Sequence, residues 1–384
     1  LSCVVVDGDA AHRAELAESW PAADLVVTSY DLLRRDEALY EGQEFYACIL
    51  DEAQAIKNHT TQKYKAVCKV RSRVRFALTG TPVENRLGEL WSIFSFLMPG
   101  YLPPYKSFCS RFEKPIVQEE DQTAVRRLNQ LTGPFILRRM KSDVLKELPP
   151  KTENVYRIEL EEEQRKLYLA AVVDAREKLK AAKPEDKMAV FAVLMRLREI
   201  CCDPRLIADN WEGGSAKLDA CVELCEAMAE NGHQILLFSQ FTSMLDRLRE
   251  RLDALHISNF TLQGSTPKEK RAAMVKAFNA GSASVFLISL KAGGMGLNLT
   301  AADIVIHYDP WWNQAAQDQA TDRAHRIGQQ AHVQVYKLIA KDTIEERILE
   351  LQNRKLALLD TISGCEEAGI LNMSSEELLS LLKS

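Results

Sequence analysis

No apolar run in the sequence reaches the ~18–20 residues needed to span a bilayer, and no basic segment precedes an apolar stretch near its first residue. We therefore expect neither a membrane partner nor a secretory signal, and we place the protein in the cytoplasm. The sequence also lacks a starting methionine and opens in an apolar stretch, LSCVVV, that is typical of a strand. We expect these 384 residues to be part of a longer protein.

The nine cysteines include no C-x-x-C pair, and the closest groupings, Cys201 with Cys202 and Cys221 with Cys225, have no matching pair of histidines. This spacing favours buried, reduced thiols over a metal site. A strongly basic composition is missing too, because 49 lysines and arginines are outnumbered by 54 acidic residues. Binding to nucleic acid would therefore depend on a local basic surface, since the net charge is −5.

Short apolar runs that end in small or polar residues recur along the chain, with helical patterns between them. Runs that are apolar on both faces and alternate with helices are typical of parallel strands buried in α/β sheets. In such sheets, ligands bind beyond the carboxyl ends of the strands. The predicted strands lie within residues 24–31, 45–54, 74–82, 234–241, 284–294, 303–310 and 333–340.

The alternation of strands and helices is interrupted between about residues 87 and 212, where the pattern is helical and charged. One long amphipathic helix is predicted over 160–182, and the α/β pattern returns after a Gly-Gly pair at 213–214. We therefore predict an α/β protein with four parts. These are the end of a first lobe at 1–86, helical protrusions and a linker at 87–214, a second lobe at 215–350 and a helical tail at 351–384.

Two adjacent carboxylates, Asp51 and Glu52, directly follow a predicted strand. Such a pair can hold Mg²⁺ with its first member and orient or deprotonate an attacking water with its second. A charged turn is the plainer interpretation of two acidic residues alone. The next predicted strand ends in Thr79, Gly80 and Thr81, where small hydroxyl residues and glycine permit close backbone approach.

A glycine-rich segment, KAGGMGLNLT at residues 291–300, follows another predicted strand, and its backbone N–H groups could wrap phosphate oxygens. It is not a Walker A loop, because no G-x-x-x-x-G-K-[ST] occurs in the chain. Arg323 and Arg326 are three residues apart, and we predict them on one face of a helix. Arginine suits the oxygens of a transferring phosphoryl group, whereas a surface salt-bridge face is the plainer interpretation.

Three further features each have two interpretations. Trp311 and Trp312 either stack on nucleic-acid bases or pack in the core or as a wedge between the lobes. The basic cluster at 135–141 either neutralises DNA phosphates or braces the helical region against the lobes, and we favour bracing. His325 acts either as a base or as a packing and hydrogen-bonding residue, and we favour the second role.

Taken in order, these segments resemble the Swi/Snf-related family of superfamily 2 helicase-like ATPases. The fourth letter of the DEAH-like box is Gln54 here instead of histidine, as in the bacterial and archaeal branch of that family. The resemblance extends over about residues 24–330. The matching segments are TSYD (28–31), LDEAQAIKN (50–58), LTGTPVEN (78–85), PFILRRMKSDV (134–144), LFSQFT (237–242), LQGSTPKEKR (262–271), LISLKAGGMGLNLTAAD (287–303), DPWWN (309–313) and QATDRAHRIGQ (319–329).

The resemblance implies two RecA-like parallel-sheet lobes, the first truncated at its N-terminus, with a helical insertion between them. It implies that Asp51 binds Mg²⁺, that Glu52 activates water, and that Arg323 and Arg326 are arginine fingers reaching across an inter-lobe cleft. The resemblance assigns the coupling of the sites to Thr79, Gly80 and Thr81. It assigns ATP contacts to Gln54, Gly294, Gly296, Asn298 and Gln319. It assigns DNA contacts to Thr28, Ser29, Tyr30, Gln240, Gly264, Ser265 and Thr300.

The function implied by the resemblance is that of an ATP-driven, monomeric translocase on double-stranded DNA that remodels DNA-bound proteins in a prokaryotic nucleoid. The alternatives are a strand-separating DNA or RNA helicase and a non-catalytic scaffold. Because the family's phosphate-binding loop is absent from the sequence, we expect this chain by itself to hydrolyse no ATP. For the same reason we expect exposed apolar surface in the first lobe and lower stability there than in the second.

Overall fold

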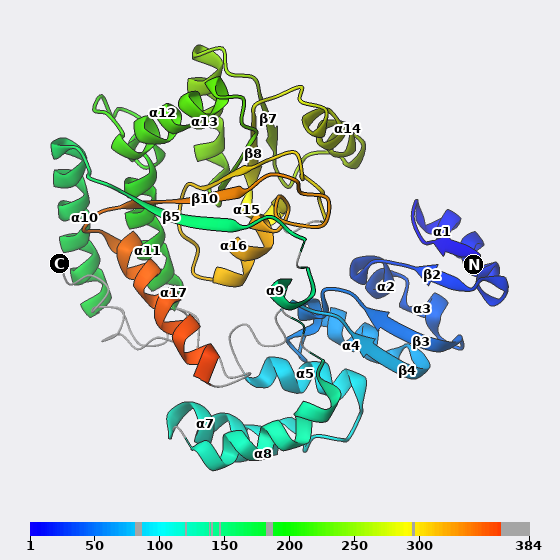
Figure 1. Cartoon of the computed structure of the whole chain (residues 1–384). Coiled ribbons are helices and arrows are strands. Elements are labelled where there is room, and N and C mark those ends of the chain that lie inside the picture. Colours follow the sequence, from blue (N-terminus) through cyan, green and yellow to red (C-terminus); the bar gives the residue numbers. More distant parts are fainter. Residues whose placement is uncertain are drawn as a thin grey trace. The chain divides into compact units, whose positions relative to one another are not determined.

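The computed structural model shows two compact units, one formed mainly by residues 1–137 and the other mainly by residues 138–354 (Figure 1). Both contain parallel strands joined by helices, so the predicted α/β class is confirmed. No helix in the described part of the chain is long and apolar enough to cross a membrane. The described residues are 1–80, 87–119, 121–137, 139, 141–145, 147–181, 187–293 and 296–361.

The described residues of the first unit form four strands in two parallel pairs, and all four fall where strands were predicted. The pairs are β1 (Cys3–Val5) with β2 (Leu25–Val27), and β3 (Glu44–Leu50) with β4 (Arg71–Ala77). The intervening helices are α1 (Ala10–Glu18), α2 (Tyr30–Arg35), α3 (Glu37–Tyr40) and α4 (Gln62–Lys69), with 3-10 turns at Trp20–Ala22 and Ala53–Ile56.

Only one face of these strands is covered within the described residues. On the covered face, side chains such as Trp20 and Val67 form a shared core with the strands. On the other, the register places Ile49 beside Phe76, and Ile49, Phe76 and Leu78 are 58%, 53% and 54% exposed. Parallel sheets are ordinarily covered on both faces. The first unit therefore presents a bare apolar sheet face.

A helical cluster follows in the same unit, at the start of the region predicted to be helical. Helix α5 is apolar on most sides and is buried along most of its length, whereas α8 contributes an apolar stripe that includes Val125 and Leu128. The elements of this cluster are α5 (Leu87–Leu97), α6 (Tyr105–Phe108), a π-helical turn (Cys109–Glu113), α7 (Lys114–Gln118), α8 (Gln122–Thr132) and a 3-10 turn (Gly133–Phe135).

The second unit is built on a six-stranded parallel sheet with the order β5-β10-β9-β6-β8-β7. β6, β8 and β9 are buried at every position, which explains why they occur in the sequence as uninterrupted apolar runs. These three strands and β10 lie where strands were predicted in this part of the chain, so those predictions are confirmed. The bounds are β5 (Lys151–Ile158), β6 (Ile235–Ser239), β7 (Asn259–Leu262), β8 (Val285–Ser289), β9 (Ile304–His307) and β10 (Val333–Ala340).

Strand β5 lies inside the region predicted to be helical, so that prediction is wrong at this point. It pairs with β10 at the edge of the sheet, and seven of its eight positions are exposed. Because this edge strand is exposed on both sides, its sequence shows no alternation of apolar and polar residues that would predict a strand. The second compact unit includes β5. The domain limits placed at residues 86, 214 and 350 stay predictions.

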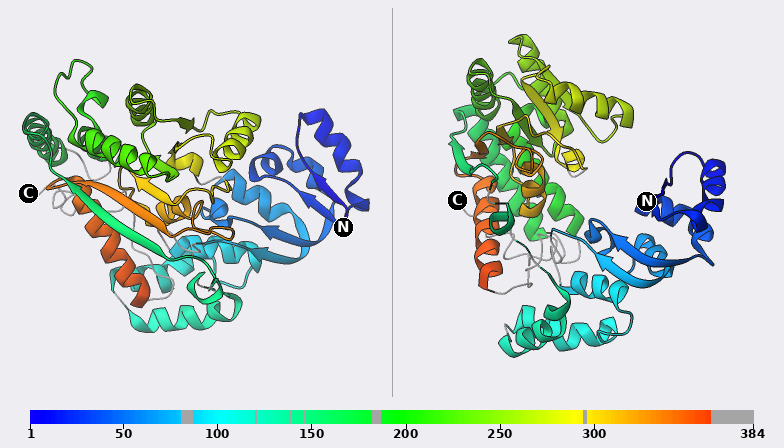
Figure 2. Two further views of the ribbon diagram at one scale, coloured as in Figure 1. Left: turned by 45° about the horizontal axis from the view of Figure 1, so that its top comes forward. Right: turned by 45° about the vertical axis from the view of Figure 1, so that its right-hand side comes forward.

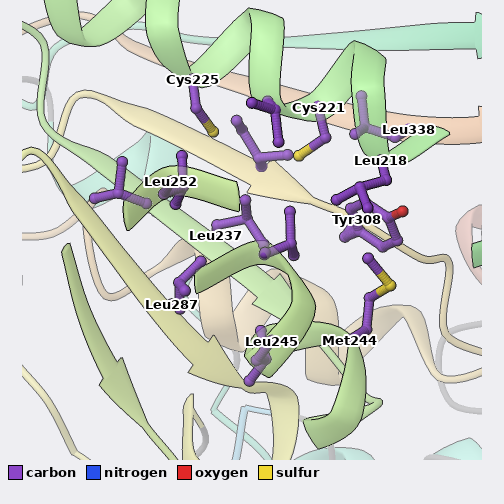
Figure 3. Close-up of a cluster of buried hydrophobic side chains, with 14 of the residues drawn as sticks. Leu218, Cys221, Cys225, Leu237, Met244, Leu245, Leu252, Leu287, Tyr308 and Leu338 are labelled. Carbon is purple, nitrogen blue, oxygen red and sulfur yellow. The ribbon is translucent and has the colours of Figure 1, made fainter. Parts of the chain in front are cut away.

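Helices cover both faces of the second sheet. The core on one face is formed by the strands with α12 and α13 and includes Leu218, Cys221, Leu245 and Leu287 (Figure 3). Cys225 is buried in the same core, as predicted for reduced thiols. The core on the other face draws on α14, α15 and α16. These helices are α12 (Ala216–Glu230), α13 (Thr242–Ala254), α14 (Lys268–Asn279), α15 (Leu290–Gly293) and α16 (Gln314–Thr321).

Three longer helices of the second unit, whose ribbons Figure 2 shows in two further views, share another apolar core. They are α10 (Glu162–Ala181), which confirms the predicted long helix, α11 (Lys187–Cys202) and α17 (Ile344–Thr361). A fully buried ion pair ties α17 to α12, because Lys217 Nζ donates to both carboxylate oxygens of Glu345 at 2.7 and 2.6 Å. Removing one partner would leave an uncompensated buried charge, so this pair specifies where α17 packs.

Candidate active-site residues

The two predicted carboxylates lie at the carboxyl end of β3, where the strand leads into a 3-10 turn. Glu52 has a left-handed backbone conformation, with φ 49° and ψ 52°. Because this conformation is uncommon for residues other than glycine, it indicates a local constraint at this position. The Asp51 carboxylate accepts a hydrogen bond of 2.9 Å from the Glu52 backbone N–H. Both residues are exposed and accessible to a ligand.

A chain of hydrogen bonds joins Glu52 to the end of the neighbouring strand. Gln54 Nε2 donates to Glu52 Oε2 at 2.6 Å, and Thr79 Oγ1 donates to Gln54 Oε1 at 2.8 Å. The three side chains meet because β3 and β4 are parallel neighbours whose carboxyl ends lie at the same edge. We name Glu52, Gln54 and Thr79 the carboxylate relay. Gly80 follows it in an exposed position, and Thr81 lies outside the described residues.

The predicted DNA-contacting residues of the first unit lie beside the same strand end. The Tyr30 hydroxyl donates to the backbone carbonyl of Asp51 at 2.8 Å. Burial raises the pKa of Tyr30 and the Asp51 charge raises it further, so this hydroxyl remains a donor. Ser29 caps α2 by accepting a hydrogen bond from the Leu32 N–H, and Thr28 is half-buried. DNA contacts by these residues stay a prediction.

The donor set around Asp51 fits a Mg²⁺ ion that is shared with a nucleotide. Such an ion takes one or two carboxylates together with phosphate oxygens, and it keeps several of its waters. The exposed Asp51 carboxylate accepts a hydrogen bond from Glu52 and has further lone pairs for a metal-bound water. Among the described residues, no group of three or more His, Cys, Asp and Glu side chains is placed to hold a metal.

In the second unit, residues 297–299 of the glycine-rich segment lie against the segment that carries the two arginines. The Leu299 N–H donates to the Arg323 carbonyl at 3.0 Å, and Arg326 Nη1 donates to the Leu297 carbonyl at 3.3 Å. Two motifs that are separate in the sequence thus form one structural element.

The prediction that both arginines lie on one helix face is wrong. Helix α16 ends at Thr321, and residues 322–328 form a series of turns and bends, which we name the arginine turn. Gly328 has a φ of 104° there, a conformation that favours glycine. Arg323 is only 8% exposed and Arg326 is half-buried, so the alternative of an exposed salt-bridge face fails as well.

The other residues of the second unit that were predicted to contact ATP, together with Thr300, which was predicted to contact DNA, lie near the arginine turn. Gly296 and Asn298 are exposed, and the Asn298 carbonyl accepts a hydrogen bond from the Asn279 side chain at 2.8 Å. Thr300 and Gln319 are half-buried. Gly294 lies outside the described residues. The ligand contacts of this group stay predictions.

Lys141 and Pro149 brace the arginine turn. Lys141 Nζ lies 2.5 Å from the Asp322 carboxylate. His325 Nε2 lies 2.8 Å from the Pro149 carbonyl, so this ring nitrogen carries a proton and donates. These contacts favour bracing by the basic cluster and a hydrogen-bonding role for His325.

Gln240, Gly264 and Ser265 follow the carboxyl ends of β6 and β7. Gly264 and Ser265 are exposed in a turn, whereas Gln240 is half-buried and its backbone N–H donates to the Asp309 carboxylate at 3.3 Å. Their DNA contacts stay a prediction. Asp309 itself was not predicted as a site residue, although an aspartate just after an apolar strand is the same signal that identified Asp51.

The tryptophan pair packs within the second unit. The guanidinium carbon of Arg198 lies 5.6 Å from the Trp311 ring centroid and 5.5 Å from that of Trp312. Trp312 also packs against the apolar core of α10, α11 and α17. These contacts favour packing in the core over base stacking.

His307 is a buried histidine at the end of β9 that the sequence analysis missed, because a lone histidine in a strand carries no distinctive signal. Its Nε2 lies 2.8 Å from Thr321 Oγ1, and its ring stacks on Phe238 with a centroid distance of 5.6 Å. Burial lowers the pKa of His307 to about 3, and the positive charge of Lys337 contributes. The neutral ring therefore connects β9 to the residue that precedes the arginine turn.

We expect His307 to make the protein less stable in mild acid. The pKa of His307 is about 3 in the folded chain, against ~6.5 for an exposed histidine, so its contribution is present above pH ~6.5 and is lost as the pH falls. Between pH 7 and pH 5 this linkage amounts to about 2 kcal/mol of unfolding free energy. Urea unfolding at both pH values should show that His307→Gln loses this difference.

A matched control for that measurement is His256→Asn, because asparagine tolerates the left-handed backbone found at this exposed histidine, with φ 57°. This variant should keep the pH dependence of the unchanged protein. If His307→Gln kept the pH dependence of the unchanged protein, groups other than His307 would be its cause.

Residues 1–206 match the SNF2-related domain family, and residues 216–328 match the helicase conserved C-terminal domain family. An ATP-dependent helicase of Mycoplasma genitalium is 38% identical over 100% of this chain and 37% of its own length. The SWI/SNF-related matrix-associated actin-dependent regulator of chromatin subfamily A member 1 of Homo sapiens is 37% identical over 93% of this chain and 35% of its own length. The chain thus spans little more than a third of these relatives.

Two solved structures extend the comparison to the fold. The Sulfolobus solfataricus SWI2/SNF2 ATPase core in complex with dsDNA is 34% identical, with a TM-score of 0.52, over 99% of this chain and 81% of that one. The ATPase core domain from the same organism gives the same identity and TM-score over 78% of its length. These matches confirm the predicted RecA-like lobes.

Proposed function

The chain belongs to the SNF2-related family of ATP-dependent helicases, and we propose that it forms part of an ATP-driven translocase that moves on double-stranded DNA and remodels protein–DNA complexes. The observation that carries this proposal is the carboxylate relay. It links an exposed carboxylate at the end of one parallel strand to a hydroxyl at the end of the next, where ligands of α/β sheets bind. A scaffold without catalytic activity has no use for such an arrangement.

The proposed roles follow from the chemistry of the side chains. Asp51 holds Mg²⁺ through an oxygen or a bound water, and the ion, when present, neutralises phosphate charge. Glu52 orients and deprotonates the attacking water, and the relay keeps its carboxylate in one orientation. Arg323 and Arg326 stabilise the charge that develops on the transferring phosphoryl group. Gln54 contributes to nucleotide binding through its place in the relay.

The DNA-facing residues proposed here lie on both units. Gly264 and Ser265 are exposed after β7, and Tyr30 joins the segment after β2 to Asp51. The structural relative solved with double-stranded DNA supports a DNA ligand. A monomer on the DNA of a prokaryotic nucleoid is part of this proposal, and a bacterial relative that matches over the whole chain supports a prokaryotic source.

Duplex DNA should stimulate ATP turnover more than single strands do. The measurement needs a polypeptide that carries this chain together with a phosphate-binding loop, since no such motif occurs among the 384 residues. The affinity for DNA should fall steeply with salt, because phosphate contacts release counterions. Equal stimulation by single-stranded RNA, or displacement of one strand of a duplex, would favour a strand-separating helicase.

The 384-residue chain alone should bind ATP–Mg²⁺ weakly and release no phosphate. A Walker A loop holds the triphosphate with backbone N–H groups and a lysine, and the sequence contains no such motif. We propose that another polypeptide segment supplies the loop and covers the apolar face that includes Ile49, Phe76 and Leu78. Calorimetric titration and a phosphate-release assay test this, and micromolar binding with multiple turnovers would contradict it.

A further inference from the structure

Arg198 of α11 is a fully buried arginine with a precise set of partners. Its Nη2 donates to Asp309 Oδ2 at 3.1 Å and to the Pro310 carbonyl at 2.5 Å. The side chains of Arg198 and Asp309 are both 0% exposed. Buried charges persist when they are paired and hydrogen-bonded, so Arg198 holds the carboxylate of Asp309 in place.

Aromatic rings from two different segments surround the same guanidinium. Its central carbon lies 5.4 Å from the Phe241 ring, which follows β6. It lies 5.6 and 5.5 Å from the rings of Trp311 and Trp312, which follow β9. Cation–π attraction of this kind strengthens when water is excluded. Arg198 therefore joins the segment after β6 to the segment after β9.

The other oxygen of Asp309 holds the turn after β6. Ser239 Oγ donates to Asp309 Oδ1 at 2.6 Å, and the Gln240 N–H donates to the same oxygen at 3.3 Å. Ser239 Oγ in turn accepts a hydrogen bond from the Phe241 N–H at 3.1 Å. The carboxylate that Arg198 orients thus sets the backbone of Gln240, one of the residues to which the family resemblance assigns DNA contacts.

The segment after β9 leads from Arg198 to the arginine turn. The Trp311 N–H donates to Gln317 Oε1 at 3.3 Å, and Gln317 lies on α16. Gln352 Nε2 of α17 donates to Gln317 Oε1 at 2.7 Å and also to the Trp311 carbonyl. Because α16 leads directly into the arginine turn, the placement of Trp311 is transmitted to the start of that turn.

This cluster also holds buried polar atoms without a hydrogen-bond partner in the part of the chain that the structure describes. Two are donors, Arg198 Nε and Trp312 Nε1, and two are acceptors, Gln240 Oε1 and Gln352 Oε1. Leaving such atoms unpaired is costly, so a shift of the cluster that brings each of them a partner would offset part of its own cost. A ligand that contacts one member of the cluster can favour such a shift when it binds the shifted state more tightly.

We propose that Arg198 is a positioning residue that couples DNA contact at the turn after β6 to the arginine turn. This inference rests on the proposed function, because it requires turnover that DNA stimulates. DNA contact at Gln240 shifts the Asp309 carboxylate, Arg198 follows it, and Trp311 and α16 move with the guanidinium. Arg198 touches neither nucleotide nor DNA in this scheme.

The test compares basal and DNA-stimulated ATP turnover in a polypeptide that carries this chain together with a phosphate-binding loop. Arg198→Lys keeps the charge and loses the planar fork. The ratio of stimulated to basal turnover should fall at least about tenfold, while basal turnover and the Kd for DNA stay within about twofold. Arg196→Lys, at an exposed position on the same helix, should leave the ratio unchanged.

A second variant covers the possibility that Arg198→Lys fails to fold. Arg198→Gln combined with Asp309→Asn removes both charges and leaves neither unpaired. It should unfold cooperatively and show the same loss of DNA stimulation. An unchanged ratio, equal losses of basal and stimulated turnover, or failure of both variants to fold would make Arg198 purely structural and overturn the proposal. Absence of DNA stimulation in the unchanged protein would contradict the proposed function, and this inference with it.

Discussion

Glu52→Gln should lower the kcat of ATP hydrolysis by about 10²- to 10⁴-fold, the usual range for loss of a general base. The amide is nearly the same size as the carboxylate, so it can still accept the 2.6 Å hydrogen bond from Gln54 Nε2. Binding of ATP and DNA should stay close to that of the unchanged protein, since the lost charge acts on the attacking water and not on ground-state affinity. Steady-state turnover and equilibrium binding, measured in a polypeptide that includes a phosphate-binding loop, check both parts.

Glu44→Gln is a matched control for Glu52→Gln. Glu44 is exposed at the start of β3, so the substitution changes the same charge in the same strand, at the end away from the relay. It should leave kcat unchanged. If Glu52→Gln kept more than about a tenth of the kcat, a loss under ~1.4 kcal/mol, Glu52 could not be the base.

Arg323→Lys and Arg326→Lys should each lower kcat by about 10³-fold or more, the range for arginine fingers. Lysine keeps the positive charge but cannot present a planar fork to phosphate oxygens. It also avoids the larger packing loss expected from alanine at Arg323, which is 8% exposed. The Kd for DNA should change little.

Arg249→Lys on α13 is a suitable control for the arginine variants, because Arg249 is an exposed arginine of the same unit and forms an ion pair with Asp246 at 3.6 Å. It should behave like the unchanged protein, and thermal unfolding should show that all three variants are folded. Loss of DNA binding with normal basal hydrolysis in either arginine-turn variant would instead assign that arginine to the DNA surface.

Much of this protein could be predicted from local sequence signals. Central parallel strands such as β6 and β8 are buried on both faces, so their burial appears in the sequence as a continuous apolar run. Asp51 and Glu52 could be located because they directly follow such a run, and the order of the motifs led to the family. Each of these signals lies within a few consecutive residues.

Other features were decided by contacts between distant parts of the chain. Strand β5 forms because an otherwise polar segment finds a hydrogen-bonding edge on β10, and that edge is not encoded near residue 151. Arg323 and Arg326 lie in a turn instead of a helix because the backbone of this segment bonds to the glycine-rich segment through Leu299.

The tertiary structure also decided which charged and titratable residues matter inside the second unit. In the sequence, Arg198 is one arginine in a helical run and His307 is a lone histidine in a strand. Their properties come from being enclosed, Arg198 beside Asp309 and His307 beside Thr321. Desolvation and pairing depend on what surrounds a side chain in space, whereas strand and motif signals depend on neighbours in the chain. For that reason the sequence determined the fold class and the position of the carboxylates, and only the folded chain determined the carboxylate relay, the arginine turn and the Arg198 cluster.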